Sequence, residues 1–206
     1  MTRIVNNCVA LVCLCLFWGQ SLRAADASHS EQIKWGNESV FNEEHNTLGL
    51  FSGVLGGQIV LAGGTSDDYS RWGRNAVCLS ENAGFALYED VLSKPLAYGA
   101  SITLSDGILC IGGRDSSQCY EDVFFVTMQQ GKLNVSEDWP PLPFPLSNAA
   151  GALLDNKVYL FGGRKSVSPS RLSDSFFVLD LSNKSRGWKE LPGYPGCVRE
   201  DAILVV

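Results

Sequence analysis

A phrase of apolar residues closed by two glycines occurs three times in the chain and constrains its fold more than any other feature. The pairs are Gly63-Gly64, Gly112-Gly113 and Gly162-Gly163, so successive pairs begin 49 and 50 residues apart. A regular spacing of this length is typical of architectures in which each repeat forms one supersecondary unit. We therefore expect stacked copies of a single unit.

Other landmarks keep the same step. "PLAYGA" begins at Pro95 and "PLSNAA" begins at Pro145, while Trp139 precedes "PPLP" and Trp188 precedes "ELPGYP". Downstream of the glycine pairs, "EDVFFVT" corresponds to "SDSFFVLD". These agreements extend the repeat well beyond the glycines.

Each unit reads as four short strands. A small-residue segment such as "AGALL" leads through a turn at "DN" or "SDG" to the apolar strand that ends in the glycine pair. A polar loop, an aromatic strand and a closing strand near the tryptophan follow. Such runs bounded by turn residues predict strands, and no long segment has the 3.6-residue period of a helix.

The apolar runs do not alternate, which indicates sheets covered on both faces. Four-stranded sheets packed in this way predict an all-β fold, a β-propeller. The glycine pairs are interpreted as places where strands run beside a crowded central axis without room for Cβ atoms.

The N-terminus has the order of a secretory signal peptide. Arg3 is followed by an apolar run over residues 8–18 and by small residues, with cleavage expected after Ala24 or Ala27. The alternative is a membrane anchor, but the run is about half of the ~20 apolar residues that span a bilayer. We expect a signal peptide over 1–24, a segment over 25–46 that could supply a blade-closing strand, and a propeller over 47–206. A secreted or periplasmic protein, free of the membrane after cleavage, is predicted.

Charge and metal-ligating residues exclude several classes of function. Without residues 1–24 the chain keeps 14 basic and 22 acidic side chains, a net charge of −8, so a nucleic-acid partner is not expected. The two histidines, His29 and His45, are too few for a histidine-rich metal site, and no phosphate loop or hydrolase motif occurs. No cofactor is expected.

Four cysteines follow the expected cleavage site: Cys78, Cys110, Cys119 and Cys197. They allow three disulfide connectivities, which their spacing does not distinguish. Cys110 lies inside an apolar run, where a free buried thiol is the commoner outcome.

The repeat resembles the kelch family in "LCIGG" with Tyr120 and Trp139, and in "YLFGG" with Phe176 and Trp188. The longer phrases "GLFSGVLGGQIVLAGGTSDDY", "PLAYGASITLSDGILCIGGRDSSQCYEDVF" and "NAAGALLDNKVYLFGG" resemble the cyclically permuted mutarotase branch, related to N-acetylneuraminate epimerase. This resemblance runs from about Leu48 to the C-terminus.

The resemblance implies a propeller of about six blades, of which the chain would hold about three to three and a half. Its open blade faces are then expected to favour self-association. The implied activity is cofactor-free interconversion of sialic acid anomers by a positioned acid and base. In relatives these groups lie in a Gly-Glu blade, expected here beyond Val206, so the resemblance assigns no catalytic residue to this chain.

Five residues are candidates for binding a sugar acid. Arg114 and Arg164 each follow a glycine pair directly, and a guanidinium suits bidentate capture of a carboxylate. The alternative is that they cap strand ends or pair with Asp115 and neighbouring acids. Tyr98 and Asn148 occupy matching positions before successive units, with Arg199 near the equivalent place in the next.

The predicted function is that of an exported propeller related to sialic acid mutarotases and epimerases, with a small sugar acid as its ligand. The alternative is a non-catalytic kelch module that binds protein or glycan through the same loops, because a propeller scaffold does not determine function.

Overall fold

The structure, a computed structural model, describes residues 48–80, 84–193 and 195–205. The described residues all lie in one compact unit, within Ser39–Val206. The expected signal peptide and the 25–46 segment lie outside the described residues. No helix within the described ranges is long and apolar enough to cross a membrane.

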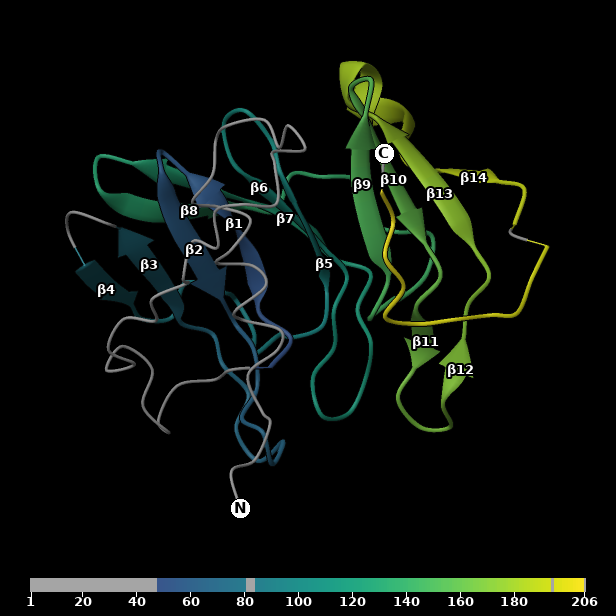
Figure 1. Cartoon of the computed structure of the whole chain (residues 1–206), viewed down its shortest axis with the longest axis horizontal. Coiled ribbons are helices and arrows are strands. Elements are labelled where there is room, and N and C mark those ends of the chain that lie inside the picture. The colour runs from purple at the N-terminus through teal and green to yellow at the C-terminus, as the bar shows by residue number, and fades with distance from the viewer. Residues whose placement is uncertain (1–47, 81–83, 194, 206) are drawn as a thin grey trace, which may run out of the picture. The chain divides into compact units, whose positions relative to one another are not determined.

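Three four-stranded antiparallel sheets account for nearly all of the strands (Figure 1). The first sheet contains β1 (Phe51–Leu55), β2 (Gln58–Ala62), β3 (Ala76–Ser80) and β4 (Gly84–Tyr88). The second contains β5 (Ala100–Thr103), β6 (Ile108–Ile111), β7 (Val123–Gln129) and β8 (Lys132–Ser136). The third contains β9 (Ala150–Leu154), β10 (Lys157–Phe161), β13 (Phe176–Asp180) and β14 (Lys189–Leu191).

Each sheet is a meander in chain order, and the third carries two additions. A hairpin of β11 (Arg164–Ser166) and β12 (Arg171–Leu172) extends beyond the ends of β10 and β13 (Figure 1). A short 3₁₀ segment, η1 (Leu181–Arg186), joins β13 to β14, and the Asp180 side chain accepts from the Ser182 amide at its start. Four strands per repeat, as the spacing predicts, are confirmed in all three units.

The sheets pack on one another through their first strands, β1 against β5 and β5 against β9. The Ser52 amide donates to Ser101 Oγ (3.1 Å) and the Val54 amide donates to Thr103 Oγ1 (3.2 Å). Since β1 is the edge strand of its sheet, these two backbone amides bond to side chains of the next sheet. The sheets are therefore successive blades, and the prediction of an all-β, propeller-type packing is confirmed.

Two apolar clusters fill the spaces between the blades. Phe51 and Phe124 meet edge to face, with ring centroids 5.2 Å apart, between the first and second blades. Phe177 and Phe144 do the same at 5.4 Å between the second and third. Every residue of β6 is buried because the second blade has a neighbour on each face. In β10, burial alternates, so the expectation of continuous burial holds for the middle blade and not for the third.

Neighbouring backbone crowds the glycine pairs, as expected from sequence. Both members of each pair have positive φ. At Gly112, an added Cβ would collide with the carbonyl oxygen of Leu146, in the segment entering the next blade, and the Gly113 amide donates to that oxygen (2.8 Å). The same contact recurs at the other two pairs. The backbone that approaches the first glycine of each pair is therefore the segment that enters the following blade.

The tryptophans that keep the repeat step also lie at blade junctions. Trp139 packs on Phe125 with ring centroids 5.2 Å apart, and Trp188 Nε1 donates to the carbonyl of Pro140 (3.0 Å). Both tryptophans pack against the apolar cluster between the second and third blades.

The four cysteines of the described residues are free thiols. Cys78, Cys110 and Cys119 are buried and Cys197 is exposed. Burial raises the pKa of Cys78 to about 11 and raises that of Cys110 further. The prediction of a buried free thiol at Cys110 is confirmed, and none of the three disulfide connectivities is formed.

Candidate functional site

The residues that follow the glycine pairs occupy equivalent places. Thr65, Arg114 and Arg164 each form an isolated antiparallel bridge with the segment that enters their own blade. Thr65 is fully buried and its hydroxyl donates to the Arg71 carbonyl (2.7 Å). The two arginines are half-buried, and their surroundings differ.

Arg114 lies among three aromatic rings, Tyr69, Trp72 and Tyr98, which we call the aromatic surround. Its guanidinium carbon is 4.6 Å from the centroid of Tyr98, 5.1 Å from Trp72 and 6.0 Å from Tyr69. Such contacts use the π face of the guanidinium and leave its N–H edge for hydrogen bonds. Two of the rings come from the β2–β3 loop, whose aromatic residues depart from the spacing of the other repeats.

The charge of Arg114 is not neutralised by an ion pair within the described residues. Nη1 donates to the backbone carbonyl of Asp115 (3.3 Å), and Nε is buried without a hydrogen-bond partner. The alternative that Arg114 pairs with the Asp115 carboxylate does not describe this geometry. Arg114 is therefore a positioned cation with donor capacity to spare.

Arg164 is engaged in a bidentate ion pair. Nε and Nη2 donate to the two carboxylate oxygens of Glu200, at 2.8 and 2.6 Å. The Glu200 hydrogen bond raises the pKa of Arg164 above its ordinary value. Because Glu200 satisfies this fork, Arg164 is less available to an anion than Arg114, although their sequence contexts are alike.

Four residues share the place where the chain enters a blade, and we call them the junction positions: Gly49, Tyr98, Asn148 and Asp201. All have positive φ. The amide of each later position donates to the carbonyl of the one before it, at 2.7 Å for Tyr98, 2.6 Å for Asn148 and 3.0 Å for Asp201. These bonds bring the side chains of successive repeats to one neighbourhood.

Asp201, and not Arg199, is the counterpart of Tyr98 and Asn148. The Arg199 carbonyl accepts from the Gly163 amide (2.9 Å), as the Leu146 carbonyl accepts from Gly113. The Arg199 side chain is exposed and donates through Nε to the Cys197 carbonyl (3.3 Å). The sequence assignment was therefore offset by two residues, which aligning "LSNAA" with "REDAI" would have revealed.

Tyr98 lies between opposite charges. Burial, a hydrogen bond with Tyr69 and the Asp201 charge raise the pKa of Tyr98, while Arg114 acts in the other direction. The net effect raises this pKa above its ordinary value, so the Tyr98 hydroxyl is a proton donor at neutral pH. The Asn148 amide donates through Nδ2 to Asp201 Oδ1 (2.9 Å), and its Oδ1 is buried without a partner.

Asp115 holds the loop that follows Arg114. Oδ1 accepts from the Ser117 amide (2.7 Å), the Ser117 hydroxyl (2.8 Å) and the Gln118 amide (2.9 Å), and Oδ2 accepts from the Tyr120 hydroxyl (2.6 Å). Burial raises the pKa of Asp115, but these hydrogen bonds outweigh it and lower the value from 3.8 to about 2. The ionised carboxylate is thus part of the loop structure.

Asp115→Asn is expected to lower the free energy of unfolding by about 1 to 2 kcal/mol at pH 6, because it weakens several hydrogen bonds to a charged acceptor. A carboxyl group whose pKa is lowered by folding stabilises the protein above its ordinary value of 3.8, and this contribution is lost as pH falls through about 2. In urea titrations the difference between wild type and Asp115→Asn should shrink between pH 4 and pH 2. Asp106→Asn, at an exposed turn residue, is the control. A difference that does not change with pH would contradict the role of the ionised form.

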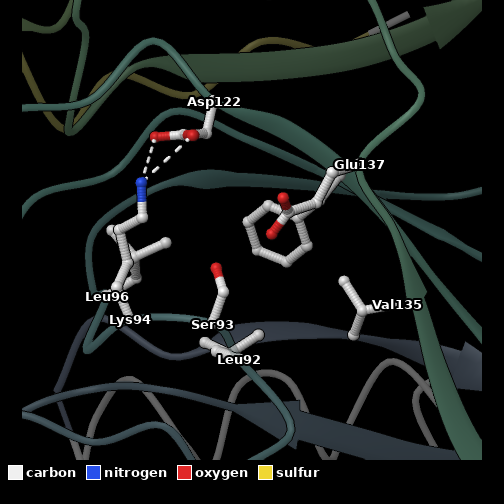
Figure 2. Close-up of a pocket in the computed structure, with 8 residues that line it drawn as sticks. Leu92, Ser93, Lys94, Leu96, Asp122, Val135 and Glu137 are labelled. Atoms are coloured by element: carbon white, nitrogen blue, oxygen red, sulfur yellow. Dashed lines mark hydrogen bonds and ion pairs between the residues drawn. The ribbon is translucent and has the colours of Figure 1, made fainter.

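A hollow lies between the β4–β5 connection and the end of β8. Figure 2 shows Lys94 and Asp122 paired at one side of it, with Nζ 3.1 and 3.0 Å from the two carboxylate oxygens. Leu92 and Val135 also line it. Because Lys94 and Asp122 neutralise each other, this hollow is less suited to an anion than the surroundings of Arg114.

Metal binding finds no support in the geometry of residues 48–80, 84–193 and 195–205. They contain no group of three or more His, Cys, Asp or Glu side chains placed to hold a metal ion.

Comparison with known proteins identifies one motif and a fold. The kelch motif family matches residues 145–192. A solved structure titled "Structure of YjhT" superposes with a TM-score of 0.61 at 11% sequence identity, over 75% of this chain and 58% of that chain. The third repeat thus carries a kelch motif, and the blades are those of a β-propeller. The low identity to the solved structure shows the fold alone.

Sequence relatives of this kelch propeller are N-acetylneuraminate epimerases. The protein of that name from Yersinia pestis (strain Pestoides F) is 32% identical over 71 residues, which are 34% of this chain and 16% of that protein. The one from Vibrio cholerae serotype O1 is 31% identical over 87 residues, 42% of this chain and 21% of that protein. The aligned segments thus span about a fifth or less of these relatives. The relationship to the epimerase branch expected from sequence is confirmed.

Proposed function

We propose that this kelch propeller binds a sugar acid of the sialic acid type at Arg114, as part of a protein that interconverts, or descends from one that interconverts, sialic acid anomers. The observation that carries the proposal is the guanidinium of Arg114, which three aromatic rings hold in place and which no carboxylate of the described residues neutralises. A carboxylate ligand would supply the missing counter-charge.

The aromatic surround favours a sugar over a small inorganic anion. Tyr69 is 50% exposed, and its ring centroid lies 6.5 Å from that of Tyr98, with the planes inclined by 20°. Exposed ring faces beside a cation offer apolar contact to the C–H face of a pyranose while the guanidinium binds its carboxylate. The names of the relatives, which contain N-acetylneuraminate, support the same ligand class.

Anomer interconversion needs an acid that protonates the ring oxygen and a base that removes the anomeric hydroxyl proton. The protonated Tyr98 hydroxyl and the Asp201 carboxylate are the groups near Arg114 with these properties. We propose them only as binding groups, since the segments aligned with the epimerases are short and the activity is that of the whole relatives.

Arg114→Ala is expected to weaken binding of N-acetylneuraminate to the purified chain about 10- to 100-fold, the usual value of a hydrogen bond to a charged group. Arg164→Ala should cost less, because Glu200 already uses that guanidinium. Arg186→Ala, an exposed arginine in η1, removes the same charge elsewhere and is the control. Isothermal titration calorimetry checks all three.

Absence of binding by the wild type, or equal losses for Arg114→Ala and Arg186→Ala, would contradict the proposal. A chain that binds sialic acid can then be tested for faster anomer exchange in an NMR time course. Binding without faster exchange would favour the non-catalytic kelch module.

A further inference from the structure

The junction positions combine backbone strain with polar side chains. Tyr98, Asn148 and Asp201 have φ values of 61, 55 and 52°, a region that residues other than glycine adopt rarely. Such conformations are strained for a residue with a Cβ and are concentrated at functional sites. Gly49 occupies the first junction position, and the Tyr98 ring lies where its Cβ would be. Polar residues therefore stand at two junction positions where glycine would be less strained.

The orientation of the Asn148 amide follows from its partner. An ionised carboxylate only accepts hydrogen bonds, so the NH₂ group faces Asp201 and Oδ1 faces away from it. That Oδ1 is buried and has no partner within the described residues, which is unfavourable. Asp201 is exposed and keeps a second carboxylate oxygen beyond the one bonded to Asn148. The Asn148–Asp201 pair thus keeps two acceptor oxygens without a described partner.

Tyr98 contacts both the cation and the Asn148 backbone. Its ring lies 4.6 Å from the Arg114 guanidinium, its carbonyl accepts from the Asn148 amide, and its hydroxyl is within electrostatic reach of both Arg114 and Asp201. The surface therefore has a donor side at Arg114 and an acceptor side at Asp201. A ligand that matches both sides carries a carboxylate and, close to it, a hydroxyl group.

We propose that Asp201, oriented by Asn148, accepts a hydrogen bond from a hydroxyl group of the sugar acid whose carboxylate binds Arg114. This inference rests on the proposed function of the Arg114 site and adds its specificity to it. A carboxylate ligand without hydroxyl groups would donate no hydrogen bond to Asp201, and the two negative charges would repel each other. Sites built to bond a hydroxyl group reject analogues that lack it. Asn148 is a positioning residue, and Asp201 determines specificity.

The test compares two ligands with the full chain by NMR titration: N-acetylneuraminate, and tetrahydropyran-2-carboxylate, which has the ring and the carboxylate but no hydroxyl groups. The substitution Asp201→Gly removes the carboxylate, and glycine adopts the positive φ of this position without strain. Asp155→Gly, at φ 47° in the exposed β9–β10 turn, is the matched control. Asp201→Gly should weaken binding of N-acetylneuraminate about 10- to 100-fold. Its affinity for tetrahydropyran-2-carboxylate should be unchanged or slightly higher.

The two proposals fail in different ways. A wild-type chain that binds neither ligand contradicts the proposed function. If the wild type binds both ligands and Asp201→Gly weakens the binding of both equally, Asp201 has a merely structural role and this inference is overturned. An unchanged affinity of Asp201→Gly for N-acetylneuraminate would overturn it as well. Asn148→Gly should show the same ligand selectivity as Asp201→Gly with a smaller loss, because the acceptor remains but its orientation does not.

Discussion

Gly112→Ala is expected to lower the free energy of unfolding by about 3 to 6 kcal/mol. The new Cβ would meet the Leu146 carbonyl oxygen, and forcing them apart costs about 1 to 3 kcal/mol. A left-handed φ of 63° adds about 1 to 2 kcal/mol for a residue with a Cβ. Displacing Leu146 also weakens its bond from the Gly113 amide, by about 1 kcal/mol.

The control for this prediction is Gly131→Ala. Gly131 has a similar φ of 73°, in the β7–β8 turn, and nothing lies within 4 Å of an added Cβ. Gly131→Ala should lower the free energy of unfolding only through the unfavourable φ of alanine, by about 1 to 2 kcal/mol. Urea titrations of both variants measure the difference, which is the contribution of the contact between blades. Equal losses would show that the Leu146 segment moves away at no cost, contrary to a tight junction.

Leu109→Ala is expected to lower the free energy of unfolding by about 2 to 5 kcal/mol, through lost apolar contact and the cavity left behind. Leu109 is 0% exposed and belongs to the cluster between the second and third blades. Because the second blade, which contains Leu109, is covered on both faces, the residues around Leu109 have little freedom to close the cavity.

Leu87→Ala is the matched control, in β4 with 46% of its surface exposed. It should change the free energy of unfolding by less than about 1 kcal/mol. Thermal or urea denaturation of the two leucine variants would check this. Comparable losses would indicate that the outer surface of β4 is covered as well as the core of the middle blade.

Much of the fold was predictable from short-range patterns. The 49- and 50-residue spacing identified the repeat, and turn residues such as Asp155 and Asn156 separated its strands. These signals are local, since each strand and turn depends on residues within its own unit. The same locality explains why the glycine pair was recognised as crowded while the segment that crowds it was not identified, because Leu146 is more than thirty residues away from Gly112.

The candidate site was predictable in part. The position after each glycine pair was read correctly as a loop site, but identical "GGR" phrases gave Arg114 and Arg164 the same expected role. Their roles diverge because an aromatic loop from the first blade reaches Arg114, whereas Glu200 from the following segment reaches Arg164. Asp201 was missed because the given sequence holds no glycine pair after it to mark its repeat.

By itself the sequence determined the repeat, the four strands of each unit, the kelch resemblance and the polar residues that follow the glycines. Those features depend on residue type and spacing, which a chain carries before it folds. Only the tertiary structure decided which arginine keeps an unneutralised charge and which residues stand at the junction positions. Contacts between blades settle both, since they join residues about fifty positions apart, and no local pattern encodes the partner that packing brings to each side chain.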